Sequence, residues 1–288
     1  MKAVILGADG QVGRALAALA PDGIELDALS RAQCDLTDPA SVRAALEASR
    51  PDLLFNAAAY TAVDRAESEP ESARAVNATS AGIAAALAHE LGARTIHIST
   101  DFVFGSGGGR PFRTGDRVAP QGAYARSKAE GEQAVRAADP RALIVRTAWV
   151  YAEAGGNFVT TMVRLMRERE TIGVVADQIG TPTWASSLAA ALWRLAGMGA
   201  KGTHHFTDAG VASWYDFAAA IEEEGRAAGL LQRPCRVMPI TTADYPTPAP
   251  RPAYSVLDKS ESWALLGQPA PHWRVNLRHS LERMAQNG

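Results

Sequence analysis

The chain has 288 residues, of which 47% are hydrophobic, and its formal charge is only −2, from 29 basic and 31 acidic residues. The length suits one large domain or one and a half. The even mixture of charges excludes the electrostatic footprint of a protein that binds nucleic acid or a membrane surface. We therefore expect a small molecule as partner, with no nucleic acid and no membrane.

The location of the protein is also predicted from composition. No stretch approaches the roughly 18 apolar residues of a membrane span, and Met1-Lys2 runs directly into an apolar segment without room for a signal peptide. Cys34 and Cys235 are too few for a disulfide framework and lack metal-ligand spacing, which fits a reducing compartment. These features predict a cytoplasmic protein.

Short apolar segments alternate with alanine-rich amphipathic stretches along the first half of the chain. The expected strands cover residues 3–6, 24–29, 53–56, 96–99 and 142–145, and the expected helices cover 11–19, 39–49, 72–91 and 125–138. Asp38 before Pro39 marks a helix start, because the carboxylate can accept an unpaired N–H and proline lacks the N–H that it would leave unpaired. Continuous apolar strands are typical of parallel sheets covered on both faces. The pattern predicts an α/β fold with a Rossmann-type doubly wound parallel sheet.

The alternation loosens after about residue 150. Gly155-Gly156 and the run Gly107-Gly108-Gly109 predict mobile loops. The prolines between Pro246 and Pro252 predict an extended segment that cannot be helix.

The segment Gly7-Ala8-Asp9-Gly10-Gln11-Val12-Gly13 follows the first expected strand and opens the first helix. Its glycines allow a tight turn and close backbone approach, so the N–H groups of this loop, including those of Asp9, Gln11 and Val12, can bind a pyrophosphate. A plain turn is the alternative. The position at the start of an alternating chain favours a dinucleotide cofactor.

The end of the second expected strand predicts which cofactor. An acidic residue there would bind the ribose 2′-hydroxyl of NAD, but the chain has Ser30-Arg31. A guanidinium and a hydroxyl suit a 2′-phosphate, so we expect NADPH, with NADH left open and a solvent-exposed arginine as the alternative. Asp35 and Leu36 are expected to flank the adenine.

Tyr124 and Lys128 lie four residues apart, hence on one face of the expected helix. A neighbouring cation lowers the pKa of a phenol, and a positioned phenol can protonate a developing alkoxide. Thr100, at the end of the fourth strand, can bind the same substrate oxygen. Chance spacing is the alternative for the pair, and a strand-end cap is the alternative for Ser99 and Asp101.

Four motifs together resemble the extended short-chain dehydrogenase/reductase superfamily over roughly the first 150 residues. They are the glycine loop, Asn56-Ala57-Ala58-Ala59, Ser99-Thr100-Asp101 and Tyr124-x-x-x-Lys128. A narrower resemblance, to the dTDP-4-dehydrorhamnose reductase family, covers nearly the whole chain. It rests on NAAAYTAVD at 56–64, RTAWVY at 146–151, DQIGTPT at 177–183 and YPTPAPRP at 245–252.

The resemblance implies an NADPH-dependent oxidoreductase that reduces the ketone at carbon 4 of dTDP-4-dehydro-β-L-rhamnose, for bacterial cell-surface polysaccharide. It implies that Thr100 and Tyr124 hold the ketone oxygen, and that Lys128 contacts the nicotinamide ribose. The backbone of Asn56, Ala57, Ala58, Ala59 and Tyr60, together with Ser99, would line the cofactor. The substrate would contact Val63, Asp101, Trp149 and Arg251. The diphosphate of the substrate would bind Arg251. The alternatives are a core aromatic for Trp149 and a surface ion pair for Arg251.

The same resemblance predicts the domains: an NADP(H)-binding domain over 1–150 and a smaller, mixed α/β nucleotide-sugar domain mainly over 151–288. Segments around 172–200 are expected to return to the first domain.

The family's metal site is where the chain departs from the resemblance. Some members bind magnesium through glutamates at a dimer interface, but Glu282 is the only carboxylate of the segment 273–284. We therefore do not expect magnesium or dimerisation through it, and a homodimer is left open. His204 and His205 are adjacent on an expected strand and point to opposite faces, so they are poor joint metal ligands.

Two other functions share this fold. A nucleotide-sugar epimerase or dehydratase would retain its cofactor tightly through purification. A non-catalytic regulatory subunit, like that of methionine adenosyltransferase, would have no use for Thr100, Tyr124 and Lys128.

Overall fold

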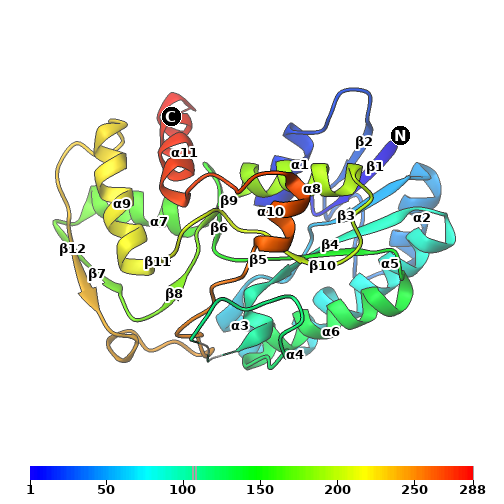
Figure 1. Ribbon diagram of the computed structural model, residues 1–288, viewed down its shortest axis with the longest axis horizontal. Helices are drawn as coiled ribbons and strands as arrows, with labels where there is room; N and C mark the ends of the chain where they lie inside the picture. The colour runs from blue at the N-terminus through cyan, green and yellow to red at the C-terminus, as the bar shows by residue number, and fades with distance from the viewer. Residues whose placement is uncertain (106, 108, 288) are drawn as a thin grey trace.

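The computed structural model describes residues 1–105, 107 and 109–287; Gly108 of the expected glycine loop lies outside this range. Six parallel strands form the central sheet in the order β10-β5-β4-β3-β1-β2 (Figure 1). Their bounds are β1 Lys2–Leu6, β2 Glu25–Leu29, β3 Leu53–Asn56, β4 Arg94–Thr100, β5 Leu143–Thr147 and β10 Gly202–His205. The predicted doubly wound sheet is confirmed.

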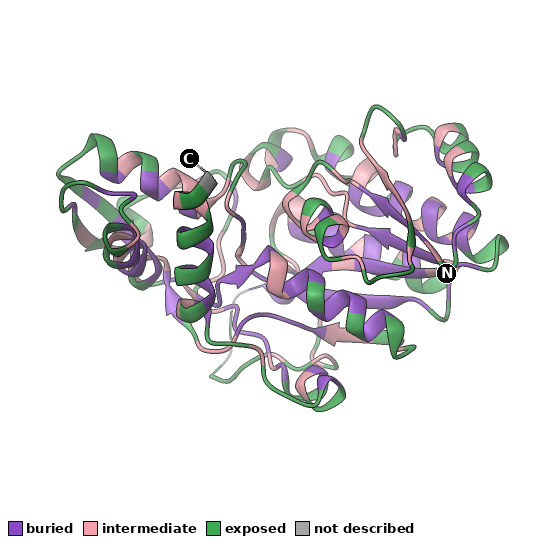
Figure 2. Ribbon diagram, turned by 90° about the horizontal axis from the view of Figure 1, so that it is seen from above, coloured by how far each residue is buried: buried purple, intermediate pink, exposed green. Residues whose placement is uncertain are grey.

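Helices cover both faces of this sheet, and the inner strands β1, β3, β4 and β5 are mostly buried (Figure 2). One face packs against α1 (Gln11–Ala18) and α8 (Ala185–Gly197) through residues such as Leu16 and Leu192. The other face packs against α2 (Pro39–Ser49), α5 (Ser80–Glu90) and α6 (Gly122–Ala138). Burial on both faces explains the apolar runs at residues 3–6 of β1, 53–55 of β3 and 143–145 of β5.

A second, smaller part of the chain has its own apolar core around Phe217. Its helices are α7 (Phe158–Glu168), α9 (Trp214–Ala227) and α11 (Trp273–Asn287), and its strands β7 (Thr171–Val175) and β12 (Arg236–Ile240) pair in parallel. Of the segment 172–200, β7 belongs to this core and α8 packs on the central sheet. The division into domains stays a prediction.

The remaining elements are short. They are α3 Val63–Ser68, α4 Pro70–Arg74, α10 Ser260–Leu266, β6 Val150–Tyr151, β8 Ile179–Gly180, β9 Thr183–Trp184, β11 Ala212–Ser213, the π-helical turn Ala75–Thr79, and 3-10 turns at Asp101–Phe104 and Thr242–Asp244. As predicted, the segment between Pro246 and Pro252 is not helical. No helix in the described part of the chain is both long and apolar enough to cross a membrane.

Two helical predictions can be compared directly with the structure. Helix α2 has the predicted bounds, and the Asp38 carboxylate accepts from the N–H of Ala40 as predicted. The single helix expected over 72–91 is instead interrupted by the π-helical turn. The π-helical turn directs Asn77 toward the loop after β3. There the Asn77 side chain accepts from the N–H of Tyr60 and donates to the Tyr60 carbonyl. A hydrophobic pattern cannot predict such a turn, because one extra residue per turn barely changes the pattern.

Candidate active site

One large cavity, of about 840 Å³, lies at the carboxyl ends of β1, β3, β4 and β5. This is the edge where open α/β sheets bind ligands. The predicted site residues that line it are Gly7, Asp9, Gly10, Gln11, Val12, Arg31, Asp35, Leu36, Ala57, Ala58, Ala59, Tyr60, Val63, Ser99, Thr100, Asp101, Tyr124, Lys128, Trp149 and Arg251. Three predicted residues, Gly13, Ser30 and Asn56, are not part of the lining.

Backbone geometry requires glycine at both ends of the loop after β1. Gly7 has a φ of +80°, and a Cβ there would lie 2.7 Å from the backbone of Ala58. Gly13 lies below the loop, where a Cβ would lie 2.2 Å from the Gly7 carbonyl oxygen. Gly10 is the N-cap residue of α1 and brings no side chain, so the first N–H groups of the helix lack a side-chain partner. The loop has the features that a phosphate requires.

The two residues after β2 face different ways. The Ser30 hydroxyl donates to Gln33 Oε1 over 2.8 Å, outside the cavity lining. Arg31 is exposed and lines the cavity. The Asp35 carboxylate accepts from the N–H and hydroxyl of Thr37, which lowers the pKa of Asp35, and Arg31 lowers it further. Of the predicted pair, only the guanidinium is placed to meet a ligand.

Asn56 is 2% exposed and pairs with His97, with 3.2 Å between Asn56 Nδ2 and His97 Nδ1. The four residues that follow it, 57–60, pass along the cavity instead. Asn56 therefore supports this segment from below, and the alanines leave room for a ligand beside the backbone.

Tyr124 and Lys128 lie on α6, and both line the cavity. Although part of its side chain is exposed, burial raises the pKa of Tyr124 to about 12, against the effect of a hydrogen bond with Thr100. The expected lowering of this pKa is wrong for this structure, because burial dominates and the Asp101 carboxylate raises the pKa further. The Lys128 ammonium instead donates to the Ile98 carbonyl over 2.7 Å. The phenol is protonated at neutral pH, as a proton donor must be.

Lys128 is 2% exposed, and burial lowers its pKa to about 8, while Glu132 acts to raise it. The amine is therefore still mostly protonated at neutral pH. Its charge faces the same cavity as the phenol.

Thr100 and Asp101 form a buried polar pair at the end of β4. The Thr100 hydroxyl donates to Asp101 Oδ1 over 3.0 Å and accepts from the N–H of Phe102, so Thr100 is the strand-end cap that we had considered for its two neighbours. Burial raises the pKa of Asp101 to about 6. Ser99 instead donates to Glu132 Oε1 over 2.6 Å.

Trp149 has a φ of +48°, a strained value for a large side chain. Its indole stacks on that of Trp214, from the first turn of α9, with 3.5 Å between ring centroids and 5° between planes. Gly180 makes room for the ring, since a Cβ there would lie 2.5 Å from it. The stack joins the two parts of the chain at the cavity wall.

Arg251 lines the cavity near Val63 and pairs with Asp64, with 2.9 Å between Arg251 Nη2 and Asp64 Oδ2. The guanidinium also donates to the Ala249 carbonyl. The ion pair that we considered as an alternative is present, and the side chain still borders the cavity.

No group of three or more His, Cys, Asp or Glu side chains among the described residues is arranged to hold a metal ion. His205 is buried and its Nδ1 lies 3.1 Å from the Asp258 carbonyl, whereas His204 Nε2 lies 3.1 Å from the Lys201 carbonyl. The two histidines have separate structural partners.

The family described as RmlD substrate binding domain matches residues 1–286 of the chain. The chain belongs to this family. A dTDP-4-dehydrorhamnose reductase of Mycobacterium tuberculosis is 46% identical over 292 residues, which cover 99% of this chain and 93% of that protein. The enzyme of the same name from Escherichia coli is 41% identical over 99% of this chain and 98% of its own length. The resemblance seen in the sequence motifs is confirmed.

A solved structure extends this family relation to three dimensions. The dTDP-4-dehydrorhamnose reductase of Bacillus anthracis, in complex with NADP, superposes with a TM-score of 0.92 and 34% identity, covering 98% of this chain and 99% of that one.

Several cavity residues of this family member were not predicted. They are Arg14, Cys34, Thr37, Thr61, Val76, Ile98, Phe102, Thr147, Ala148, Val150, Gly155, Gly156 and Trp214. Most are neighbours of predicted residues and could have been included by extending each motif. Trp214 gives no local signal, because it comes from a helix far along the chain that packs against Trp149.

Proposed function

We propose that the protein reduces the ketone at carbon 4 of dTDP-4-dehydro-β-L-rhamnose with NADPH and so forms dTDP-L-rhamnose. The observation that carries this proposal is the position of Tyr124, Lys128 and Thr100. They line one cavity together with the glycine loop at one end and Trp149 and Arg251 at the other. The names of the relatives from two bacteria support the choice of substrate.

The residues present fit the cofactor. The loop between Gly7 and Gly13 leaves backbone N–H groups and a helix N-terminus for a pyrophosphate. Arg31 lies where the ribose of the adenosine half would follow, and a guanidinium matches a 2′-phosphate. When bound, NADPH supplies the hydride. The Bacillus anthracis relative in complex with NADP supports this choice.

The chain's own residues would provide the proton and the orientation. Tyr124, protonated at neutral pH, would donate its hydroxyl proton to the oxygen at carbon 4, and the Thr100 hydroxyl would hold that oxygen beside it. The buried Lys128 ammonium, which lines the same cavity, would contact the nicotinamide ribose, as the family resemblance implies. The indole of Trp149 and the side chain of Val63 would form the apolar wall against the deoxysugar, and Arg251 would bind the diphosphate.

Cys34 and Cys235 are buried free thiols, which supports a reducing, cytoplasmic location. A homodimer and the absence of a nucleic-acid partner stay predictions. So does the expectation that magnesium is not bound.

The experiment is turnover with the nucleotide sugar generated in place by the preceding enzymes. We expect loss of NADPH absorbance that depends on the ketosugar nucleotide, and dTDP-L-rhamnose as product. Cofactor that stays bound through purification, without net NADPH consumption, would instead indicate an epimerase or dehydratase.

A further inference from the structure

Glu132 follows Lys128 by one turn of α6 and is 1% exposed. Its Oε1 accepts from Ser99 Oγ over 2.6 Å and from Arg146 Nε over 2.8 Å, and its Oε2 accepts from Arg146 Nη2 over 2.7 Å. Arg136 Nη2 lies 3.4 Å from Oε2. A carboxylate this deeply buried stays ionised only because it is paired and hydrogen-bonded, and these partners lower the pKa of Glu132.

The contacts of Glu132 extend to β4, the strand that ends at Thr100. Lys128 Nζ donates to the carbonyl of Ile98, and the hydroxyl of the next residue, Ser99, donates to Glu132. Ser99 lines the cavity, and Thr100 follows it directly. Two side chains of α6, one turn apart, therefore hold successive residues of β4.

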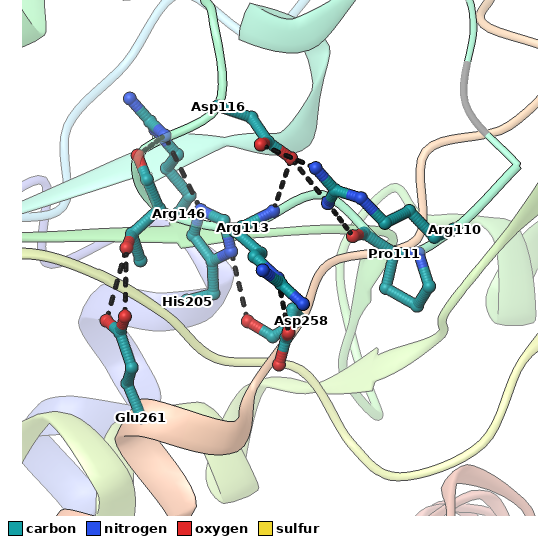
Figure 3. Close-up of polar contacts among 9 residues, drawn as sticks. Arg110, Pro111, Arg113, Asp116, Arg146, His205, Asp258 and Glu261 are labelled. Atoms are coloured by element: carbon teal, nitrogen blue, oxygen red, sulfur yellow. Dashed lines mark hydrogen bonds and ion pairs between the residues drawn. The ribbon is translucent and has the colours of Figure 1, made fainter.

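Arg146 completes this arrangement on the far side. Its Nη1 donates to the Thr114 carbonyl over 3.3 Å. The same atom lies 3.5 Å from His205 Nε2 (Figure 3). Burial and Arg146 lower the pKa of His205 to about 4, so this imidazole is neutral and adds no charge. Arg146 thus fixes Glu132 and is itself anchored at β10 and the loop around residue 114.

We propose that Glu132 is a positioning residue for the reaction: it fixes the end of β4 through Ser99 and supplies the negative charge that keeps Lys128 an ammonium. The proposal rests on the role of Lys128 in the proposed function. It gives Glu132 a task beyond the packing of α6 against the sheet.

The charged and titratable groups around Lys128 come from four elements, since Asp101, on the 3-10 turn after β4, lines the same cavity. Tyr124, Glu132 and Arg136 are on α6, His97 is on β4 and Arg146 is on β5. Burial lowers the pKa of His97 strongly, so this ring is neutral. Glu132 is the group that raises the pKa of Lys128, against the effect of burial. Because a raised lysine pKa keeps the ammonium to higher pH, loss of the Glu132 charge must move its deprotonation to lower pH.

The test is Glu132→Gln, which keeps the shape and an acceptor for Ser99. The matched control is Glu130→Gln, on the same helix, where the more exposed Glu130 pairs with Arg74 over 2.8 Å. The titration of Lys128 is measured directly, as the pH dependence of its acetylation by a trace reagent, read by mass spectrometry with the exposed Lys201 as internal reference. This readout needs no turnover, so it is independent of the proposed function.

We expect Glu132→Gln to move the Lys128 titration to lower pH by about one unit, the size of shift that a nearby opposite charge produces. Glu130→Gln should leave it in place. The alkaline limb of kcat/KM for the nucleotide sugar should move with it, since this limb reports the free enzyme. An unchanged Lys128 titration in Glu132→Gln, with a lower melting temperature, would overturn the proposal and leave Glu132 purely structural.

A second variant separates the missing carboxylate from an unpaired Arg146. Glu132→Gln with Arg146→Met removes both charges, so neither member of this ion pair is left buried without its partner. We expect the melting temperature to recover in part while the Lys128 titration stays shifted. If the titration returns to the wild-type pH, the unpaired Arg146 caused the shift and the proposal is wrong. A wild-type protein that titrates as expected but does not turn over the ketosugar would overturn only the proposed function.

Discussion

The end of the cavity that we propose for the cofactor and the end that we propose for the substrate are built in different ways. At the cofactor end, the backbone itself forms the site: Gly7 and Gly13 let loop and helix approach to distances that no Cβ allows. At the substrate end, side chains from distant segments form it: Trp214 stacks on Trp149, and Asp64 pairs with Arg251, 187 residues further along the chain.

This difference predicts how each end responds to substitution. A backbone site fails abruptly, because the main chain must move for any added atom to fit. A side-chain site loses affinity in steps, because each contact contributes its own part.

Gly13→Ala should have the largest effect at the cofactor end. The added Cβ would lie 2.2 Å from the Gly7 carbonyl oxygen, so the loop must shift. We expect NADPH affinity to fall by at least about 100-fold, more than one lost hydrogen bond would cost. Isothermal titration measures this, with Gly197→Ala as control, since a Cβ at Gly197 meets nothing within 4 Å. Affinity equal to that of the control would refute the backbone account.

Arg251→Ala should raise KM for the nucleotide sugar by roughly 10- to 100-fold, as expected for loss of a charge-assisted contact with the diphosphate. NADPH affinity should not change. Arg251→Lys should restore only part of the loss, because a point charge cannot replace the guanidinium fork. Should the alanine variant lose thermal stability at an unchanged KM, the ion pair with Asp64 is the whole role of Arg251.

Trp214→Ala should raise KM for the nucleotide sugar by about tenfold, since the indole of Trp149 loses the ring that holds it. Trp263→Ala is the matched control: a partly buried tryptophan on α10 that lies outside the cavity lining. Equal effects of the two substitutions on KM would show that the stack does not shape the substrate end.

Arg31→Ala should have an effect of similar size to Trp214→Ala, a loss of NADPH affinity of about tenfold, because Arg31 is exposed and its charge is screened. NADH affinity should stay nearly the same, since NADH has no 2′-phosphate. Comparing the dissociation constants of NADPH and NADH tests this. Equal losses of affinity for both cofactors would show that Arg31 does not bind the 2′-phosphate.

The same difference explains what the sequence could predict. Local patterns follow from backbone geometry and could be predicted. They include the glycine spacing, the strand ends at Asn56 and Thr100, and the spacing of Tyr124 and Lys128. The partner of Trp149 comes from a helix far along the chain, which no local pattern shows. The Ser30 hydroxyl has a local partner instead, Gln33, three residues further along.

The pKa of Tyr124 was mispredicted for a related reason. Spacing places Lys128 on the same helix face as the phenol, but burial depends on the whole fold and raises the pKa of Tyr124, and the Asp101 carboxylate raises it further. Likewise, the π-helical turn brings Asn77 to Tyr60, a tertiary contact that the hydrophobic pattern does not predict.

The central claim is that the two ends of the cavity serve one reaction at Tyr124, and Tyr124→Phe tests it most directly. Turnover of the nucleotide sugar with NADPH should fall by about 100- to 10,000-fold, the contribution of a general acid, while NADPH affinity stays near the wild-type value. Tyr245→Phe, at a tyrosine that is 62% exposed, should behave as the wild type. Turnover of Tyr124→Phe within a few-fold of the Tyr245→Phe control would contradict the account.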